Sequence, residues 1–310
     1  MAQALEFAAL QTLSHEPFLA LYTHASVPAR DNCGEKVPIS VKTICIEEPL
    51  RSGWSGQDAF AVAEALNGQV LRALEGRRTL RTEIAGCGYY AKIHRGIGWG
   101  EIIKNLLSLR LPVLGAGNEW RALRRLTALG VDTMRPVAFG ERGTNPATRH
   151  SFIVTEELAP TVSLEDYCRD WPTVPPASTF KRALIRRVAE MARRMHRGGV
   201  NHRDFYICHF LLHLPADQHA PKLSLIDLHR AQVRQQVPHR WRNKDLAALY
   251  FSALDIGLTR RDFLRFLKTY FGRPLRHILQ DEAQLLAHLE TEAARLIDRY
   301  RRKFAPGAAP

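Results

Sequence analysis

Apolar and polar residues alternate along three neighbouring segments in the first half of the chain. The segments are QVLRALEG (69–76), TLRTEIAG (79–86) and YYAKIHRG (89–96), and glycines lie between them. Alternation with a period of two is typical of half-buried strands, and glycine supplies the turns that join them. The pattern therefore predicts an antiparallel meander.

Two further strand patterns and two amphipathic helices follow this meander. The helices are expected at 99–109 (WGEIIKNLLSL) and 118–130 (NEWRALRRLTALG), the second ending at a glycine. The strands are expected at 134–143 (MRPVAFGERG) and 150–158 (HSFIVTEEL). Together these elements predict a five-stranded sheet that carries one key helix.

The second half of the chain has the period of helices. Long helical patterns cover 178–199, 243–257, 259–272 and 281–304, and two short apolar runs at 207–214 and 222–229 predict a strand pair. The fold class is therefore α+β with two lobes, an N-lobe at 44–158 and a mostly helical C-lobe at 159–310. Residues 1–43 lack a period, and we interpret them as an N-terminal extension that is disordered or precedes the native start.

Composition adds a strong positive charge to this picture. The 310 residues include 44 Lys and Arg against 31 Asp and Glu, a net charge of +13. Such a balance favours partners that carry negative charge. The five cysteines form no CxxC pair, which favours a reducing compartment, and no uncharged apolar run reaches the ~18 residues that cross a bilayer. We expect a cytoplasmic protein.

Two aspartates in the second half each lie beside a short apolar run. Asp204 ends the triplet His202-Arg203-Asp204, and Asp227 follows LSLI in the second run. The triplet alone is equally consistent with a surface loop that holds an ion pair. Phosphoryl transfer needs two such carboxylates, because one accepts the proton of the attacking hydroxyl and the other holds Mg²⁺ on the nucleotide phosphates.

Lys92 and Glu119 supply a second candidate pair in the first half. Lys92 lies within an apolar strand, where burial is costly unless an opposite charge meets it, and Glu119 begins a predicted helix. An exposed edge-strand lysine and a helix-start glutamate are the simpler readings of these residues. The chain order Lys, Glu, Asp, Asp nevertheless matches the kinase order of phosphate lysine, its glutamate, catalytic aspartate and metal aspartate.

From about Ile44 onward, the sequence resembles the lipopolysaccharide core heptose(I) kinases of Gram-negative bacteria. These belong to the Kdo/heptose kinase branch of the protein-kinase-like fold. The strings that carry the resemblance are LEGRRTLRTE, AKIHRGIGWGEIIKNLL, LPVLGAGNEW, HSFIVTEELAPTV, GVNHRDFYICHFLLH, IDLHRAQ and RWRNKDLAALYFSALDIGLTRRD.

The resemblance implies a role for each site residue. Asp204 would be the catalytic base, with His202 and Arg203 supporting its loop and Asp245 bracing it from the next helix. Asp227 would bind Mg²⁺. The nucleotide, ATP, would be held by Lys92 with Glu119 at the phosphates and by the segment Glu156–Leu158 at the adenine.

The chain also departs from the protein-kinase pattern in two places. His209 stands five residues after Asp204, where kinases have a metal-binding asparagine, and imidazole suits Mg²⁺ less well than oxygen does. His209 is thus a candidate ligand of the metal or of a water or phosphate near it. The glycine-rich loop retains only Gly76, so Arg77 and Arg78 are candidates to bind phosphate through their side chains.

The resemblance implies phosphorylation of the first heptose of the lipopolysaccharide inner core, on its 4-hydroxyl. The expected partners are the lipid A–core glycolipid and the anionic surface of the inner membrane, to which the protein would be peripheral. The positive charge is also compatible with an acidic carrier protein such as acyl carrier protein.

Other functions remain open at this point. A kinase that acts on the Kdo sugar or on protein tyrosine has the same motifs. A zinc site at His202, Cys208, His209 and His213 has suitable ligand types, but a strand would point Cys208 and His209 to opposite faces. A pI near 9.9 fits a nucleic-acid binder, yet the sequence lacks a zinc finger, an RRM signature and aromatic–basic interleaving, so no nucleic-acid partner is expected.

Overall fold

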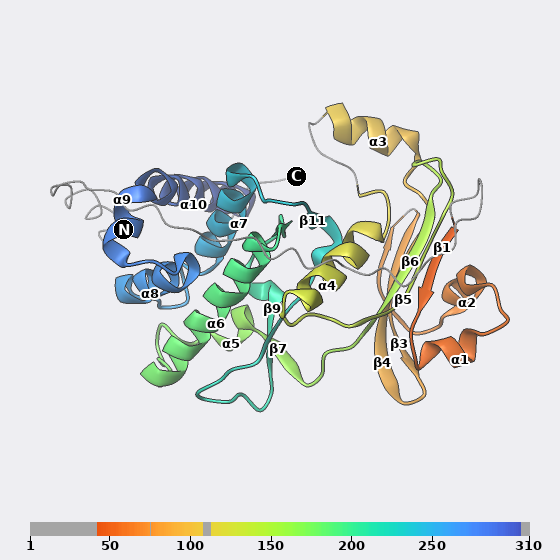
Figure 1. Ribbon diagram of the computed structural model, residues 1–310, viewed down its shortest axis with the longest axis horizontal. Coiled ribbons are helices and arrows are strands. Elements are labelled where there is room, and N and C mark those ends of the chain that lie inside the picture. The colour runs from red at the N-terminus through yellow and green to blue at the C-terminus, as the bar shows by residue number, and fades with distance from the viewer. Residues whose placement is uncertain (1–41, 75, 108–112, 305–310) are drawn as a thin grey trace. The chain divides into compact units, whose positions relative to one another are not determined.

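The computed structural model describes residues 42–74, 76–107 and 113–304 (Figure 1). Most of the expected N-terminal extension, residues 1–41, therefore lies outside the described residues. The last two residues of that extension, Lys42 and Thr43, are described. They begin a strand of the main sheet and pair with Arg142 and Glu141. The first strand thus starts two residues before the expected N-lobe boundary.

An antiparallel sheet of six strands forms the first half of the described chain. Its spatial order is β1-β5-β6-β4-β3-β2. The meander and the two later strands were predicted, and β1 adds a sixth strand to the five expected because it pairs with β5 at the edge. The bounds are β1 Lys42–Ile46, β2 Gln69–Leu74, β3 Arg77–Ile84, β4 Cys87–His94, β5 Pro136–Arg142 and β6 His150–Glu156.

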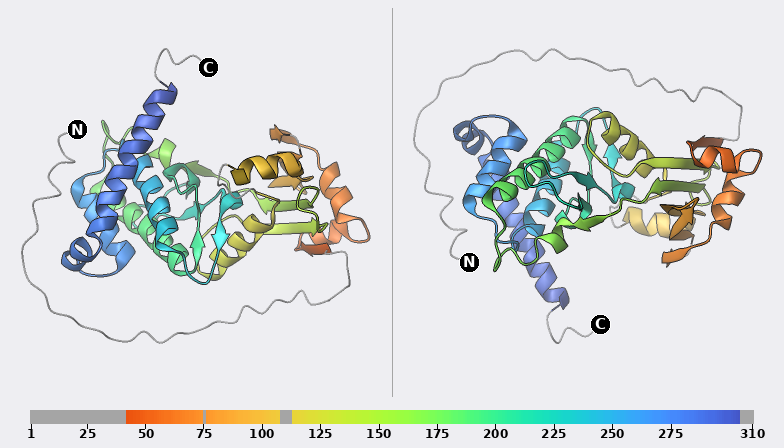
Figure 2. Two further views of the ribbon diagram at one scale, coloured as in Figure 1. Left: turned by 90° about the horizontal axis from the view of Figure 1, so that it is seen from above. Right: turned by 90° about the horizontal axis from the view of Figure 1, so that it is seen from below.

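Helices pack on both faces of this sheet (Figures 1 and 2). On one face, α1 (Leu50–Trp54) and α2 (Ala59–Ala65) bury Trp54 and Phe60 against the strands. On the other face, α4 (Gly117–Ala128) packs against β5 and contacts the second half of the chain. Helix α3 (Gly98–Leu107) follows β4. Successive strand residues point to opposite faces of a sheet. Only the polar side chains of β3 and β4 that face away from α1 and α2 can therefore approach α4.

The second half is mostly helical, which confirms the α+β class. Its long elements are α6 (Ser178–Arg197), which packs along α8 (Arg260–Phe271), and α7 (His239–Ser252), which packs against α10 (Ala283–Phe304). The shorter helices are α5 (Leu164–Tyr167) and α9 (Leu275–Asp281), the latter absent from the sequence prediction. No helix within the described ranges is long and apolar enough to cross a membrane.

Small strands and turns in the second half of the chain carry or flank the candidate residues Asp204, His209 and Asp227. The first apolar run was predicted as a strand throughout, but it begins with a 3₁₀ turn, η2 (Ile207–His209), before β9 (Phe210–His213). The remaining elements are β7 (Thr161–Ser163) and β10 (Leu223–Leu225) beside β9, the pair β8 (Val200–Asn201) and β11 (Gln232–Val233), and the turn η3 (Leu228–Arg230).

Candidate active site

Lys92 and Glu119 form an ion pair between the sheet and helix α4. Lys92 Nζ lies 2.7 Å from Glu119 Oε1, and the glutamate side chain is only 1% exposed. Alternation along β4 explains the geometry, since Tyr89, Ala91 and Ile93 face the core while Lys92 faces α4. The structure therefore brings together the two residues that the sequence paired, and it excludes the reading of Lys92 as an exposed edge residue.

Asp227 lies within reach of the same lysine. Its Oδ1 is 4.0 Å from Lys92 Nζ and accepts a 2.6 Å hydrogen bond from His229 Nδ1. Burial opposes ionisation, but the hydrogen bond from His229 and the positive charge of Lys92 outweigh it and hold the pKa of Asp227 below its ordinary value. Asp227 is therefore a carboxylate that stays ionised at neutral pH.

A buried carboxylate from helix α7 holds the loop that carries Asp204. Asp245, 1% exposed, accepts hydrogen bonds from the backbone N–H groups of His202 and Arg203 at 2.7 and 2.8 Å. His196 adds a hydrogen bond to the same carboxylate. Arg203 has a φ of 76°, a conformation that costs energy in a non-glycine residue, so the two hydrogen bonds stabilise a strained loop. The expected bracing by Asp245 is confirmed.

The side chains of His202 and Arg203 point away from the Asp204 carboxylate. His202 is fully buried, and its Nε2–H donates to the carbonyl oxygen of Ile226. The guanidinium of Arg203 lies over the ring of Trp241. Both residues therefore position the loop, as expected, and neither contacts the carboxylate that would do the chemistry.

Arg230 contacts that carboxylate instead, and the sequence prediction missed it. Its Nη1 donates a 2.7 Å hydrogen bond to Asp204 Oδ1. The turn η3 begins directly after Asp227, whose φ of 60° places it in the left-handed region. This turn directs His229 to Asp227 and Arg230 to Asp204, so one short segment contacts both acids. The signal in the sequence was a histidine and an arginine in the string IDLHRA.

His209 connects the two aspartates. Its Nδ1 lies 2.6 Å from the backbone carbonyl oxygen of Asp204, and its Nε2 lies 3.5 Å from Asp227 Oδ2. A carbonyl oxygen only accepts, so Nδ1 carries the hydrogen, and in the neutral ring Nε2 presents its lone pair toward Asp227. A ring nitrogen oriented in this way by a hydrogen bond at the other nitrogen is the usual arrangement of a metal-ligating histidine.

The donor set at Asp227 and His209 fits a single Mg²⁺ bound together with nucleotide phosphates. Magnesium is commonly held in proteins by one or two carboxylates, with phosphates and waters completing its shell. The zinc alternative has no such support. Within the described residues, no group of three or more His, Cys, Asp and Glu side chains is arranged to hold a metal, and His213 bonds to Ser224 Oγ.

Of the two arginines at the start of β3, only Arg77 faces the site. Arg77 pairs in register with His94, and burial lowers its pKa while the charges of Glu119 and Asp227 oppose that shift. Arg78 points to the opposite face, where its guanidinium donates to the backbone oxygens of Glu64 and Leu66. The expectation that Arg78 binds phosphate is wrong for this physical reason: adjacent strand residues face opposite sides.

Gly76 is required by its own backbone surroundings. Its φ is 71°, and a Cβ at this position would lie 2.1 Å from the carbonyl oxygen of Gly96. Glycine therefore allows β3 to begin next to the loop that follows β4. Gly76 immediately precedes Arg77. This close approach therefore fixes the position of Arg77, the first residue of β3, whose side chain faces the site.

The segment Glu156–Leu158 leaves the sheet at the end of β6. The N–H of Glu156 bonds to the carbonyl oxygen of Arg135, and the N–H of Glu157 bonds to that of Gly88. The Glu157 carboxylate accepts two 2.7 Å hydrogen bonds from Arg81 and one from Tyr90. Sequence reasoning placed the segment but missed Glu157, whose side chain fixes it to β3 and β4.

His94 is a second residue that the prediction missed. It is 2% exposed on the same face of β4 as Lys92. Burial, together with the positive charges of Arg77, Lys92 and His229, lowers its pKa to about 3. The ring is therefore neutral in the folded protein over most of the acid range.

His94 makes the stability of the folded protein depend on pH. As pH falls from about 6.5 toward 3, the unfolded chain gains a proton at His94 that the folded protein does not, so stability is lost. We expect His94→Gln to reduce the slope of unfolding free energy against pH by up to about 1.4 kcal/mol per unit between pH 6 and 4. Urea unfolding at each pH measures this slope. The exposed His277→Gln is the control, and equal slopes in both variants would contradict the assignment.

Comparison with known proteins decides the family to which this site belongs. The model of the lipopolysaccharide kinase (Kdo/WaaP) family matches residues 62–270, which is more than half of the chain. The chain belongs to this family. The match spans all four candidate polar residues, Lys92, Glu119, Asp204 and Asp227, so the site described above lies within the matched region.

Individual relatives match over most of their length. The chain is 64% identical to the lipopolysaccharide core heptose(I) kinase WaaP of Pseudomonas aeruginosa over 261 residues, which is 84% of this chain and 97% of the relative. It is 58% identical to the protein of that name from Escherichia coli K12, over 83% of this chain and 98% of the relative. These names support a heptose kinase over the Kdo and tyrosine alternatives.

A solved structure of WaaP in complex with acyl carrier protein matches as well. Its TM-score is 0.74 and its sequence identity is 59%, and the match covers 82% of this chain and 99% of that one. The kinase-like α+β fold expected from the sequence is confirmed by this likeness. Since the family is one of kinases, the chain is a phosphotransferase that uses ATP.

Proposed function

We propose that this protein transfers the γ-phosphoryl group of ATP to the first heptose of the lipopolysaccharide inner core, on its 4-hydroxyl. The observation that carries the proposal is the convergence of Lys92, Glu119 and Asp227, with His209 joining Asp227 to the Asp204 loop. This is the set of charges that phosphoryl transfer requires. The names of the relatives supply the acceptor, a core heptose.

The proposed roles are those that the family resemblance implies, and the positions of the side chains are compatible with them. Asp204 accepts the proton of the heptose hydroxyl and holds that oxygen in line with the phosphorus. Lys92, oriented by Glu119, binds the α- and β-phosphates, and Arg77 approaches them from β3. Asp227 and His209 would hold Mg²⁺, which neutralises phosphate charge when bound. The backbone of Glu156–Leu158 contacts the adenine.

Arg230 has an additional role in this proposal. One of its five N–H donors binds Asp204, and a guanidinium carries no acceptor, so the other donors can bind oxygens of the transferring phosphoryl group. An arginine supplied within the chain serves this purpose in some nucleotide hydrolases. Arg230 thus orients the base and stabilises the charge that develops beside it.

Substitution of Arg230 tests this role. We expect Arg230→Ala to lower kcat roughly 100-fold or more while the KM for ATP changes little, because the arginine acts on the transferring group. Arg230→Lys should recover part of the rate, since it keeps the charge and loses the planar fork. Steady-state kinetics measure both values, and Arg240→Ala, at an exposed position, is the control. Wild-type kcat in Arg230→Ala would refute the role.

The function itself is tested by direct assay. Purified protein is incubated with ATP, Mg²⁺ and a deacylated core oligosaccharide that contains unphosphorylated heptose, and the product is mapped by mass spectrometry and phosphorus NMR. Phosphate on the 4-hydroxyl of the first heptose supports the proposal. Transfer to a Kdo residue, to another hydroxyl, or to no sugar at all contradicts it.

The proposed partners follow from the substrate and the charge. The lipid A–core acceptor lies in the inner membrane, and a net charge of +13 favours peripheral association with its anionic cytoplasmic surface. An acidic carrier protein is the other proposed partner, supported by the solved relative, which is WaaP in complex with acyl carrier protein. Salt should weaken both associations, because both depend on exposed charge.

A further inference from the structure

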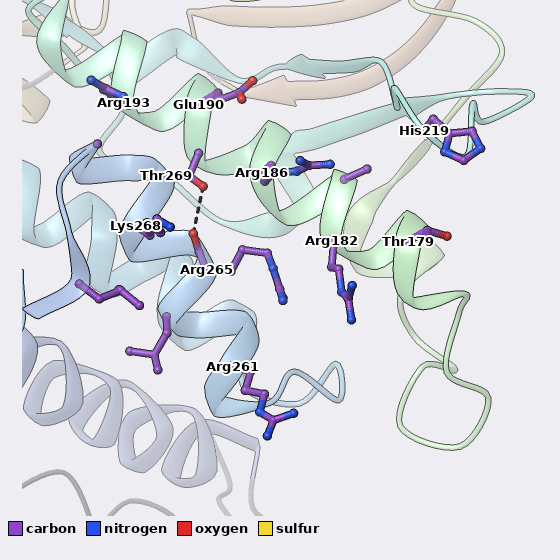
Figure 3. Close-up of a pocket in the computed structure, with 14 residues that line it drawn as sticks. Thr179, Arg182, Arg186, Glu190, Arg193, His219, Arg261, Arg265, Lys268 and Thr269 are labelled. Carbon is purple, nitrogen blue, oxygen red and sulfur yellow. Dashed lines mark hydrogen bonds between the residues drawn. The ribbon is translucent and has the colours of Figure 1, made fainter.

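A cationic groove runs between helices α6 and α8, apart from the candidate active site. It encloses a cavity of about 960 Å³. Figure 3 shows one row of cationic side chains along α6 and a second row along α8, with the groove between them. The six that define the groove are Arg182, Arg186 and Arg193 from α6 and Arg261, Arg265 and Lys268 from α8.

Most of this positive charge is not neutralised by the protein. Arg265 pairs with Asp262 at 2.8 Å. Among the described residues, the other five cationic side chains of the groove form no ion pair, and Glu190 is the only carboxylate in the lining. Neighbouring like charges destabilise the folded state unless an anion joins them, so five unpaired cations around one groove indicate a ligand with several negative groups.

The helical spacing of these residues gives the groove its two rows. Arg182, Arg186 and Arg193 recur at intervals of four and seven along α6, and Arg261, Arg265 and Lys268 recur at four and three along α8. Such intervals place each set on one face of its helix. Eleven residues of α6 span roughly 17 Å, so the groove can contact several phosphate groups at once.

The lining favours phosphate headgroups over a protein partner. Only Ala183, Leu264 and Leu275 carry apolar side chains, and no Phe, Tyr or Trp lines the groove. Protein interfaces have apolar and aromatic residues at their centre and few charges there, which is the opposite composition. Guanidinium groups, in contrast, match phosphate through two parallel hydrogen bonds. A single-stranded nucleic acid would need aromatic platforms for several bases, and His219 is the one aromatic ring among the described lining residues.

An exposed apolar residue precedes helix α6 in the chain. Val174, in the loop that leads into α6, is 69% exposed. It lies five residues before Thr179, which lines the groove beside Arg182 (Figure 3).

We propose that the α6–α8 groove binds the phosphate headgroups of anionic lipids and so fixes which face of the kinase rests on the membrane. The inference rests on the proposed function, in which the acceptor is a membrane glycolipid. It adds which surface of the kinase contacts the membrane. The groove residues would contact phosphates of the bilayer, while the acceptor sugar reaches Asp204 separately.

The test is vesicle binding by a triple variant. The probe is vesicles of phosphatidylcholine with about one third phosphatidylglycerol, compared with phosphatidylcholine alone. We expect Arg186→Glu/Arg261→Glu/Lys268→Glu to lower the partition coefficient more than roughly 100-fold, because each lost cation costs about fivefold and each added carboxylate is repelled by the surface. The matched control, Arg124→Glu/Arg240→Glu/Arg276→Glu, changes net charge equally at exposed positions elsewhere and should lose far less.

Several outcomes would overturn the assignment. One is an equal loss of vesicle binding in the groove triple and the control triple. Another is equal binding of the wild type to neutral and anionic vesicles. A third is a groove triple that keeps vesicle binding but loses affinity for a purified acidic carrier protein. If charge reversal prevents folding, Arg186→Gln/Arg261→Gln/Lys268→Gln replaces it, with roughly a 100-fold loss expected for the three charges removed.

Activity on a soluble acceptor separates this inference from the proposed function. With deacylated core oligosaccharide, the groove triple should phosphorylate heptose at the wild-type rate, because no membrane is involved. A folded triple that loses this activity would place the groove in the acceptor site and refute the lipid role. A wild type without this activity would refute the proposed function, whereas the vesicle comparison would still decide the role of the groove.

Discussion

Replacing Asp204 by asparagine is expected to lower kcat about 1,000-fold and to change the KM for ATP less than threefold. The amide has nearly the same shape as the carboxylate, but it cannot accept the proton of the heptose hydroxyl. It also exchanges an ionic hydrogen bond to Arg230 for a neutral one. The loop keeps its conformation, because Asp245 still accepts the N–H groups of His202 and Arg203.

Rates of phosphate transfer to core oligosaccharide measure this effect. The control is Asp255→Asn, which removes an exposed carboxylate from the same half of the chain and should leave kcat unchanged. Thermal unfolding with and without ATP and Mg²⁺ shows whether the nucleotide still binds. A variant that retains most of its kcat would show that Asp204 is not the base.

Replacing Lys92 by methionine is expected to impair both stability and catalysis. The change leaves the carboxylate of Glu119, 1% exposed, without its only ion-pair partner among the described residues. Removal of one partner from such a buried pair typically costs about 3–5 kcal/mol, because the remaining charge is uncompensated. The variant also lacks the cation proposed to bind the α- and β-phosphates, so we expect kcat/KM for ATP to fall at least roughly 100-fold.

The double variant Lys92→Met/Glu119→Gln separates the two effects. Since it removes both charges, the free energy of unfolding should recover most of what the single variant lost, as measured by urea unfolding. Activity should stay low, because the phosphate-binding cation is still absent. Recovery of activity along with stability would show that Lys92 serves the fold alone.

Much of the fold was predictable because its signals are local. Alternation and glycines specify β2, β3 and β4, and amphipathic periods specify α4 and α6. The elements whose form or place in the sheet was missed depend on partners distant in the chain. Strand β1 is defined by pairing with β5, and η2 forms where an apolar run leaves the catalytic loop, although its residues read as a strand.

The site was predictable to the extent that its residues belong to motifs. Lys92, Glu119, Asp204 and Asp227 were named, and the structure brings them to one region. Arg230 and His94 were not named. The position of Arg230 depends on the turn after Asp227, and that of His94 depends on which face of β4 it occupies. The error at Arg78 was avoidable, since a strand can direct only one of two adjacent arginines to a given face.

The attachment of Glu157 restricts how the two halves of the protein can open and close around a nucleotide. Its N–H bonds to Gly88, and its carboxylate binds Arg81 and Tyr90, so this residue must travel with the sheet as a rigid unit. Glu157 is therefore part of the hydrogen-bond network of the sheet, and the connection to the second half of the chain begins at Leu158. In the proposed nucleotide complex, a change in the relation of the two halves would thus leave the backbone of Glu156 and Glu157 attached to the sheet.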